Sequence, residues 1–325
     1  MWELDLDALA WSNATSTFDV VEHADDAVPA RFPASAAAVA LAHRGRILLV
    51  GGHVKQKDPK APLAVRVLDP VRKQWSVLPC EGESVPRTRG SHVACIIGDA
   101  LYVLAGESPS RKPQAGLHML DLRTSAWSQV DIEGDESGPP PCSSPVCTAY
   151  QDRYILFFGG GVVGQCSNAT WCFDTATNAW HRPQVTGQLP APRAGCCAAL
   201  LGHCWYVLGG GNNTAGGCPD MWVLDLQNFG VEALEWQRVC AFDAHSALAS
   251  EGGSVVAVPS AGALLAFGGY NGSYHNAISV FKPADAAEQT AAQLGHAVDG
   301  LDDQCAFLLT LQCAAQFYIR EVAHQ

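Results

Sequence analysis

The segment RYILFFGG, residues Arg153 to Gly160, sets the architecture because it is one copy of an element that recurs along the chain. After it comes a second short strand that ends in aspartate, WCFD with Asp174, and then a tryptophan, Trp180. Equivalent strands read RILLVGG, ALYVLAG, CWYVLGG and ALLAFGG, and the last glycines are spaced 54, 54, 50 and 59 residues apart. A period near fifty residues with this content predicts a series of similar antiparallel sheets.

Each repeated residue type has a structural reason. A strand buried on both faces reads as a continuous apolar run, and glycine permits the sharp turn at its end. Aspartate accepts backbone N–H groups in the next turn, and tryptophan fills the space between neighbouring sheets. We therefore assign structural roles to Gly51, Gly52, Gly106, Gly159, Gly160, Gly209, Gly210, Gly268, Gly269, Asp69, Asp121, Asp174, Asp225, Trp75, Trp127, Trp180 and Trp236.

The glycine pair, the tryptophan and the period resemble the kelch repeat, whose unit is one four-stranded blade of a β-propeller. The later repeats resemble the kelch half of plant-type acyl-CoA-binding proteins more narrowly. The segments that carry this resemblance are WYVLGGGNNTAGGC (Trp205 to Cys218) and LLAFGGYNGSYHNAISVFKP (Leu264 to Pro283). The resemblance implies an all-β kelch propeller over residues 1–283.

The first residues bear on the number of blades and on the ligand. WELDLDALAW matches only the second half of a repeat, so the chain starts at the third strand of its first blade. We expect the six-bladed type with an incomplete first blade, and five blades are the alternative. In the similar family an acyl-CoA-binding domain precedes the propeller. Acyl-CoA is therefore implied for this chain only through a missing upstream domain.

Residues 284–325 lose the glycine and strand pattern and are predicted to form a helical tail, with a possible coiled coil. Leu294, Val298 and Leu301 follow the alternating steps of four and three that make a coiled-coil seam. Other apolar residues, such as Phe307, lie off that seam. Self-association through the helix and docking on the chain's own sheets therefore both stay open.

Composition narrows the partners and the compartment. Twenty Lys and Arg against 32 Asp and Glu give a net charge of −12, which disfavours nucleic acid. The start, MWELDLDALAW, is acidic where a secretory signal is basic, and no apolar run reaches the roughly eighteen residues that span a bilayer. The odd number of cysteines, 13, is typical of buried thiols in a reducing compartment. We expect a cytoplasmic protein without a membrane span.

Motifs for catalysis are weak. Gly159, Gly161 and Gly164 spell GxGxxG, but a strand follows where a dinucleotide site needs a helix. Asp243, His245 and Glu251 offer metal ligands in one linker, although a solvated loop explains them more simply. The sequence therefore predicts no catalytic, cofactor-binding or metal-binding residues, with a metal-dependent kelch enzyme as the less favoured alternative.

The long polar loops between the second and third strands of each blade have the properties of recognition loops. Arginines also recur where each linker enters its blade, where they are placed to bind an acidic segment or to form structural ion pairs. The loop candidates are His53, Lys55, Glu107, Arg111, Gln165, Asn212, Asn213, Tyr270, Asn271, Tyr274 and His275, and the channel-mouth candidates are Arg31, Arg89, Arg193 and Glu251.

These features favour a non-catalytic kelch scaffold that binds an as yet unidentified protein partner. The alternative from a different class is one part of a cytosolic acyl-CoA-binding or lipid-transport protein.

Overall fold

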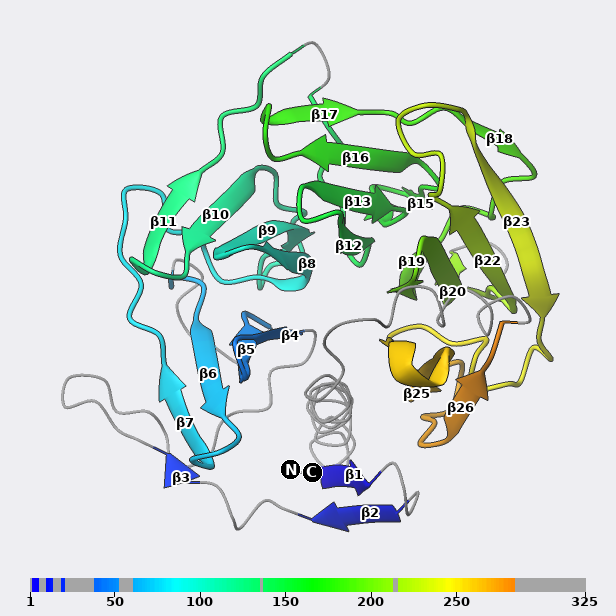
Figure 1. Ribbon diagram of the computed structural model, residues 1–325, viewed down its shortest axis with the longest axis horizontal. Helices are drawn as coiled ribbons and strands as arrows, with labels where there is room; N and C mark the ends of the chain where they lie inside the picture. The colour runs from blue at the N-terminus through cyan, green and yellow to red at the C-terminus, as the bar shows by residue number, and fades with distance from the viewer. Residues whose placement is uncertain are drawn as a thin grey trace. The chain divides into compact units, whose positions relative to one another are not determined.

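The computed structural model describes residues 2–5, 10–13, 19–20, 38–52, 61–134, 137–212 and 216–283. The chain divides into two compact units, with a boundary after Asp131. Each unit is built from sheets in which most neighbouring strands are antiparallel, and one short strand in each unit pairs in parallel at a sheet edge (Figure 1). The helical tail predicted for residues 284–325 lies outside the described residues, as do Arg31, His53, Lys55 and Asn213.

The first unit contains a hairpin and two larger sheets. The hairpin pairs β1 (Trp2–Asp5) with β2 (Ala10–Asn13). The next sheet has the order β3-β7-β6-β5-β4, with β3 (Asp19–Val20), β4 (Val39–His43), β5 (Arg46–Val50), β6 (Val65–Asp69) and β7 (Gln74–Val77). The other contains β8 (Gly90–Ile97), β9 (Ala100–Glu107), β10 (Leu117–Asp121) and β11 (Ala126–Gln129).

The second unit contains three larger sheets and one small hairpin. The first sheet contains β12 (Val146–Tyr150), β13 (Tyr154–Phe158), β16 (Thr170–Asp174) and β17 (Ala179–His181), with the hairpin β14 (Gly161–Val162) and β15 (Gln165–Cys166) between β13 and β16 in the chain. The second contains β18 (Val185–Gly187), β19 (Ala194–Leu201), β20 (Cys204–Asn212), β21 (Gly216–Gly217), β22 (Asp220–Asp225) and β23 (Leu234–Ala241). The third contains β24 (Ser254–Val258), β25 (Ala263–Phe267) and β26 (Ile278–Phe281).

The apolar second strands form the core, as their continuous hydrophobic runs predict. All five residues of β25 are buried, and so are four of the five in β13. A cluster containing Phe158, Trp205 and Trp236 joins the β12–β17 sheet to the β19–β23 sheet. Trp236 packs with ring centroids 5.3 Å from Phe158 and 6.0 Å from Trp205. The predicted role of the tryptophans between neighbouring sheets is confirmed here.

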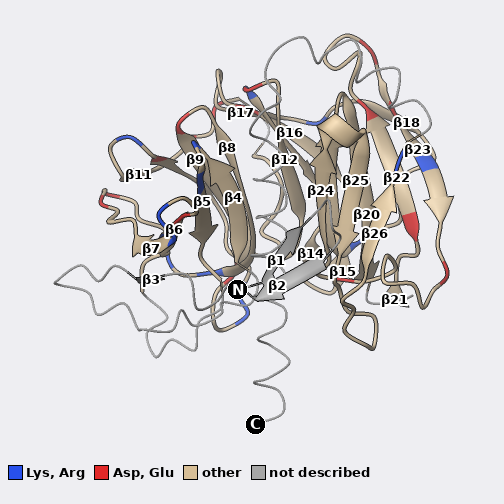
Figure 2. Cartoon of the chain, turned by 60° about the horizontal axis from the view of Figure 1, so that its bottom comes forward, with Lys and Arg blue, Asp and Glu red and all other residues tan. Residues whose placement is uncertain are grey.

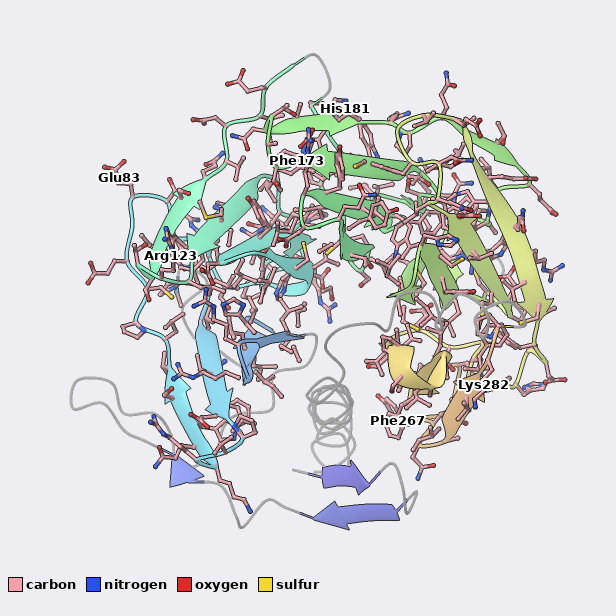
Figure 3. All side chains as sticks on the ribbon, viewed as in Figure 1. Glu83, Arg123, Phe173, His181, Phe267 and Lys282 are labelled. Carbon is pink, nitrogen blue, oxygen red and sulfur yellow. The ribbon has the colours of Figure 1, made fainter. Side chains whose placement is uncertain are left out.

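The aspartates that end the third strands also have the predicted role. The Asp121 carboxylate accepts the backbone N–H of Arg123 at 2.8 Å, and the Asp174 carboxylate accepts that of Ala176 at 2.9 Å. Figure 3 labels Phe173 and His181, which lie on the neighbouring strands β16 and β17. Figure 2 shows acidic and basic residues interspersed over the strands and turns of both units.

The prediction of an all-β fold is confirmed, and the described residues contain no α-helix. They form five sheets of three or more strands, which are the blades, and the β1–β2 hairpin is additional. That hairpin pairs Leu4 with Trp11, the register in which Leu120 faces Trp127 in a complete blade. Five blades are the alternative that the sequence left open, and the hairpin has the register of the third and fourth strands of a blade.

Candidate interaction surfaces

Arg193, one of the arginines that enter a blade, is a structural residue of the second unit. Its side chain is fully buried. The guanidinium donates to the carbonyl oxygen of Gly209 at 3.0 Å, and its Nη2 atom lies 2.8 Å from Oδ1 of Asp220. The backbone carbonyl of Arg193 accepts the N–H of Gly160 from the preceding blade at 2.9 Å. Arg193 thus connects two blades.

Arg89 repeats this arrangement in the first unit. It is 3% exposed, and its guanidinium donates to the carbonyl oxygen of Ala105 at 3.2 Å. Its own carbonyl accepts the N–H of Gly52 at 2.9 Å. Burial lowers the pKa of the Arg89 guanidinium to about 10. The positions of both arginines fit the structural interpretation better than a ring of free guanidinium groups.

The equivalent position in the last blade is occupied by Ser250, and the sequence assignment to Glu251 is corrected. The N–H of Gly210 donates to the carbonyl of Ser250 at 2.8 Å, which is the bond that Gly52 and Gly160 make to the two arginines. Glu251 lies one residue further on, where a Cβ on Gly211 would collide with Oε1 of its carboxyl group. Burial against this backbone raises the pKa of the Glu251 carboxyl.

The loop between β25 and β26 presents two aromatic side chains. Tyr270 and Tyr274 are 48% and 47% exposed, and their ring centroids are 4.8 Å apart. Hydrogen bonds hold the loop in place. The Asn271 side-chain amide donates to the carbonyl of Ser246 at 3.0 Å, and His275 Nε2 lies 2.6 Å from Oδ1 of Asn271. Four candidates from the sequence therefore gather in one ordered loop.

The other described candidates lie on separate loops. Arg111 is exposed, and its guanidinium forms a 2.6 Å ion pair with Glu107, which is itself buried at the end of β9. Gln165 is exposed in the β14–β15 hairpin, whereas Asn212, the last residue of β20, is partly buried. Arg111, Gln165 and Asn212 therefore belong to elements other than the β25–β26 loop.

The buried thiols are poor nucleophiles. Burial raises the pKa of the Cys142, Cys172 and Cys196 thiols to about 12 in each case, so they stay protonated near neutral pH. Among the residues the structure describes, Asp243, His245 and Glu251 do not bring their ligand atoms together. Instead, Asp243 Oδ1 accepts the backbone N–H of His245 at 2.8 Å, as in a solvated turn.

One surface pocket of about 390 Å³ lies along the outer strands of the second unit. Its lining includes Tyr154, Asp174, His181, Phe229 and Val231. The Asp174 carboxylate already forms bonds of 2.8 and 2.6 Å with Arg153, and this ion pair lowers the pKa of the carboxyl. The pocket therefore offers both polar and apolar surface, with the Asp174 carboxylate already paired.

With this geometry established, comparison with known proteins defines the class. The model of the KLHDC2/KLHL20/DRC7 Kelch-repeats domain matches residues 35–269, so the chain belongs to the kelch-repeat family. The similarity to Acyl-CoA-binding domain-containing protein 4 of Arabidopsis thaliana is 34% identity over 283 residues, which is 86% of this chain and 41% of that protein. Acyl-CoA-binding domain-containing protein 5 of Arabidopsis thaliana is also 34% identical to this chain, and the match covers 42% of its length.

Another relative carries the kelch name alone. Kelch domain-containing protein 1 of Mus musculus is 32% identical over 162 residues, covering 42% of this chain and 39% of that protein. The chain thus spans less than half the length of these relatives. Among the described residues, no helix is both long enough and apolar enough to cross a bilayer.

Proposed function

We propose that this chain is a non-catalytic kelch scaffold that binds a partner protein through the β25–β26 loop. The observation that carries the proposal is the Tyr270–Tyr274 pair, half exposed yet held in place by Asn271 and its bond to Ser246. Tyrosine supplies a large contact area at a small cost in side-chain entropy and is enriched among residues that dominate binding energy.

The chemistry of the described residues supports a binding role rather than a catalytic one. The repeated aspartates accept turn N–H groups, the blade-entry arginines are bound to backbone carbonyls, and the buried thiols have raised pKa values. Each of these groups is already used by the fold. The tyrosine loop, by contrast, presents apolar rings and hydroxyl groups to solvent.

The test is affinity capture with the full chain and with a Tyr270→Ala/Tyr274→Ala double variant. We expect the wild-type chain to recover a specific partner, and we expect the double variant to bind it at least about tenfold more weakly. The free energy of unfolding of the double variant should change by no more than about 0.5 kcal/mol, because both rings are half exposed.

Val231→Ala is the matched control, because Val231 is 84% exposed in the same unit but belongs to the segment between β22 and β23 and not to the loop. It should bind like the wild-type chain. Equal binding by all three proteins, or no specific partner for the wild type, would overturn the proposal.

A second candidate is the kelch part of an acyl-CoA-binding protein, which the two Arabidopsis relatives favour by their names and by their match to 86% of this chain. In this case acyl-CoA binding belongs to a part of the relatives outside the kelch repeats. Calorimetric titration of palmitoyl-CoA into this chain should then show no binding. Micromolar binding would place a lipid site within the repeats, with the 390 Å³ pocket as the first place to look.

A further inference from the structure

One corner of the β19–β23 sheet brings together three side chains of the types that bind transition metals. His203 lies in the turn between β19 and β20, and Cys204 is the first residue of β20. Cys204 faces Asp225, the last residue of β22. One ligand atom from each residue lies within 4.8 Å of the other two, and His203 Nε2 is 3.7 Å from Asp225 Oδ1.

The same corner carries different chemistry in the neighbouring blade. There Tyr154 faces Asp174, and Arg153 in the preceding turn forms two bonds, of 2.8 and 2.6 Å, with the Asp174 carboxylate. Positive charge at that corner disfavours a metal ion. His203 replaces this arginine, and Cys204 replaces the tyrosine. The corner therefore has nitrogen, sulfur and oxygen donors in place of a guanidinium–carboxylate pair.

We propose that His203, Cys204 and Asp225 bind a divalent transition-metal ion, with Zn²⁺ as the best match. Zn²⁺ accepts imidazole, thiolate and carboxylate ligands at about 2.0 to 2.3 Å in tetrahedral geometry, which requires ligand atoms about 3.5 Å apart. The histidine and aspartate atoms are already near this spacing. The longest separation, at most 4.8 Å, needs side-chain movements of only about 1 Å.

The surroundings support such a site. The Asp225 side chain is 53% exposed, which gives an ion access from solvent and leaves a fourth position for water. Its Oδ1 atom accepts the backbone N–H of Gln227 at 2.8 Å, and the carbonyl of His203 accepts that of Leu226 at 2.9 Å. These bonds hold two of the ligand residues in place before the metal arrives.

This site is separate from the proposed protein-binding surface. His203 lies at the end of the sheet opposite the loop that joins β20 to β22, and the tyrosine pair belongs to the next blade. Bound metal would connect the turn before β20 to the end of β22 and would be structural. Failure of partner binding and failure of metal binding can therefore be distinguished.

The test is calorimetric titration of Zn²⁺ into metal-free full chain, compared with His203→Gln and Cys204→Ser. We expect one tight site in the wild type, and a loss of at least about tenfold in affinity in each variant. Zn²⁺ should also raise the melting temperature of the wild type but not of the variants. Because the chain has 11 histidines and 13 cysteines, the comparison with variants decides the location.

Two further measurements establish where the ion binds and through which atoms. Asp174→Asn is the matched control at the neighbouring corner and should bind Zn²⁺ like the wild type. Co²⁺ should give a thiolate charge-transfer absorption that Cys204→Ser abolishes, and circular dichroism without metal checks that each variant folds. Equal Zn²⁺ affinity in wild type and both ligand variants, or no binding by the wild type at millimolar Zn²⁺, would overturn the proposal.

Discussion

Arg193 and the Tyr270–Tyr274 pair are both sequence candidates for partner recognition, but they occupy opposite environments within the second unit. The Arg193 side chain is fully buried and is bound to Gly209 and Asp220. Both tyrosines are about half exposed and lie against each other above a hydrogen-bonded loop. The difference shows that a residue type suited to recognition becomes available to a partner only where the fold leaves its polar groups unused.

The largest effect that tests this contrast is expected for Arg193→Ala. Removing the guanidinium leaves the Asp220 carboxylate, whose side chain is 14% exposed, without its closest cation. Breaking a buried ion pair in this way costs about 3–5 kcal/mol of the free energy of unfolding. Urea unfolding of the variant measures this loss.

Arg238→Ala is the control for that variant, because Arg238 approaches the same carboxylate from an exposed position at 3.9 Å. An exposed ion pair contributes about 0–1 kcal/mol, so the unfolding free energy should change little. If both variants lost a similarly small part of the free energy of unfolding, Arg193 would not be a structural residue. It would then again be a candidate for binding a partner.

Much of the fold could be predicted because the repeated residues act locally. The apolar run of β13, the turn at Asp174 and the buried Trp180 can each be recognised from the residues of a single repeat. The burial of Arg193 depends instead on the neighbouring blade, and no local pattern reports it. The same reason explains why the repeat pattern aligns Glu251 with the arginines, although the bond from Gly210 identifies Ser250 as the equivalent residue.

The surface sites divide in a similar way. Tyr270 and Tyr274 could be predicted from the polar loop after the glycine pair, whereas the grouping of His203, Cys204 and Asp225 could not. The repeat pattern already explains Asp225 as a turn residue, so the sequence gives no reason to expect a ligand there. The strand register that places Asp225 opposite Cys204 is known only from the folded structure. The local signal is the pair formed by His203, in the turn, and Cys204, the first residue of β20. The cytoplasmic location and the helical tail stay predictions.

A smaller effect is expected where two blades meet at Gly209. Its φ angle is +64°, and a Cβ would lie 2.7 Å from the carbonyl oxygen of Ser250. Ala105 adopts a φ angle of +59° at the equivalent position, so this backbone conformation alone does not exclude alanine. The contact with the next blade should make Gly209→Ala more destabilising than an alanine placed at a left-handed glycine with open space around it. We expect Gly209→Ala to lower the free energy of unfolding by about 2–3 kcal/mol, measured by urea unfolding.

Gly230→Ala isolates the contribution of the contact. Gly230 has a φ angle of +82° but open space around the added methyl group. This variant should lose about 1–2 kcal/mol, the cost of the left-handed backbone alone. If both glycine variants were equally destabilised, the close contact between the blades would add nothing to the cost of the substitution. The structural role of the blade-entry residues would then lose this support.

The smallest effect concerns the ion pair between Arg153 and Asp174, in which the arginine is exposed and the aspartate is buried, whereas in the Arg193–Asp220 pair the arginine is fully buried. Hydrogen bonds from Arg153 lower the pKa of the Asp174 carboxyl in the folded state. The pair therefore stabilises the fold above the ordinary aspartate pKa of about 3.9, and this contribution is lost as the pH falls through the lower folded-state value. Asp174→Asn should reduce the melting temperature by roughly 1–3 °C at pH 7.

The difference between Asp174→Asn and the wild type should shrink as the pH falls below about 4, because the wild-type carboxyl is then progressively neutralised. Melting curves at neutral, mildly acidic and strongly acidic pH measure this trend, and Arg153→Gln should show the same dependence since it removes the other half of the pair. No difference in melting temperature at any pH would mean that Asp174 acts only by accepting the N–H of Ala176, a bond that asparagine also makes. In that case the ion pair with the exposed Arg153 would contribute nothing, and the contrast with the fully buried Arg193 would become sharper.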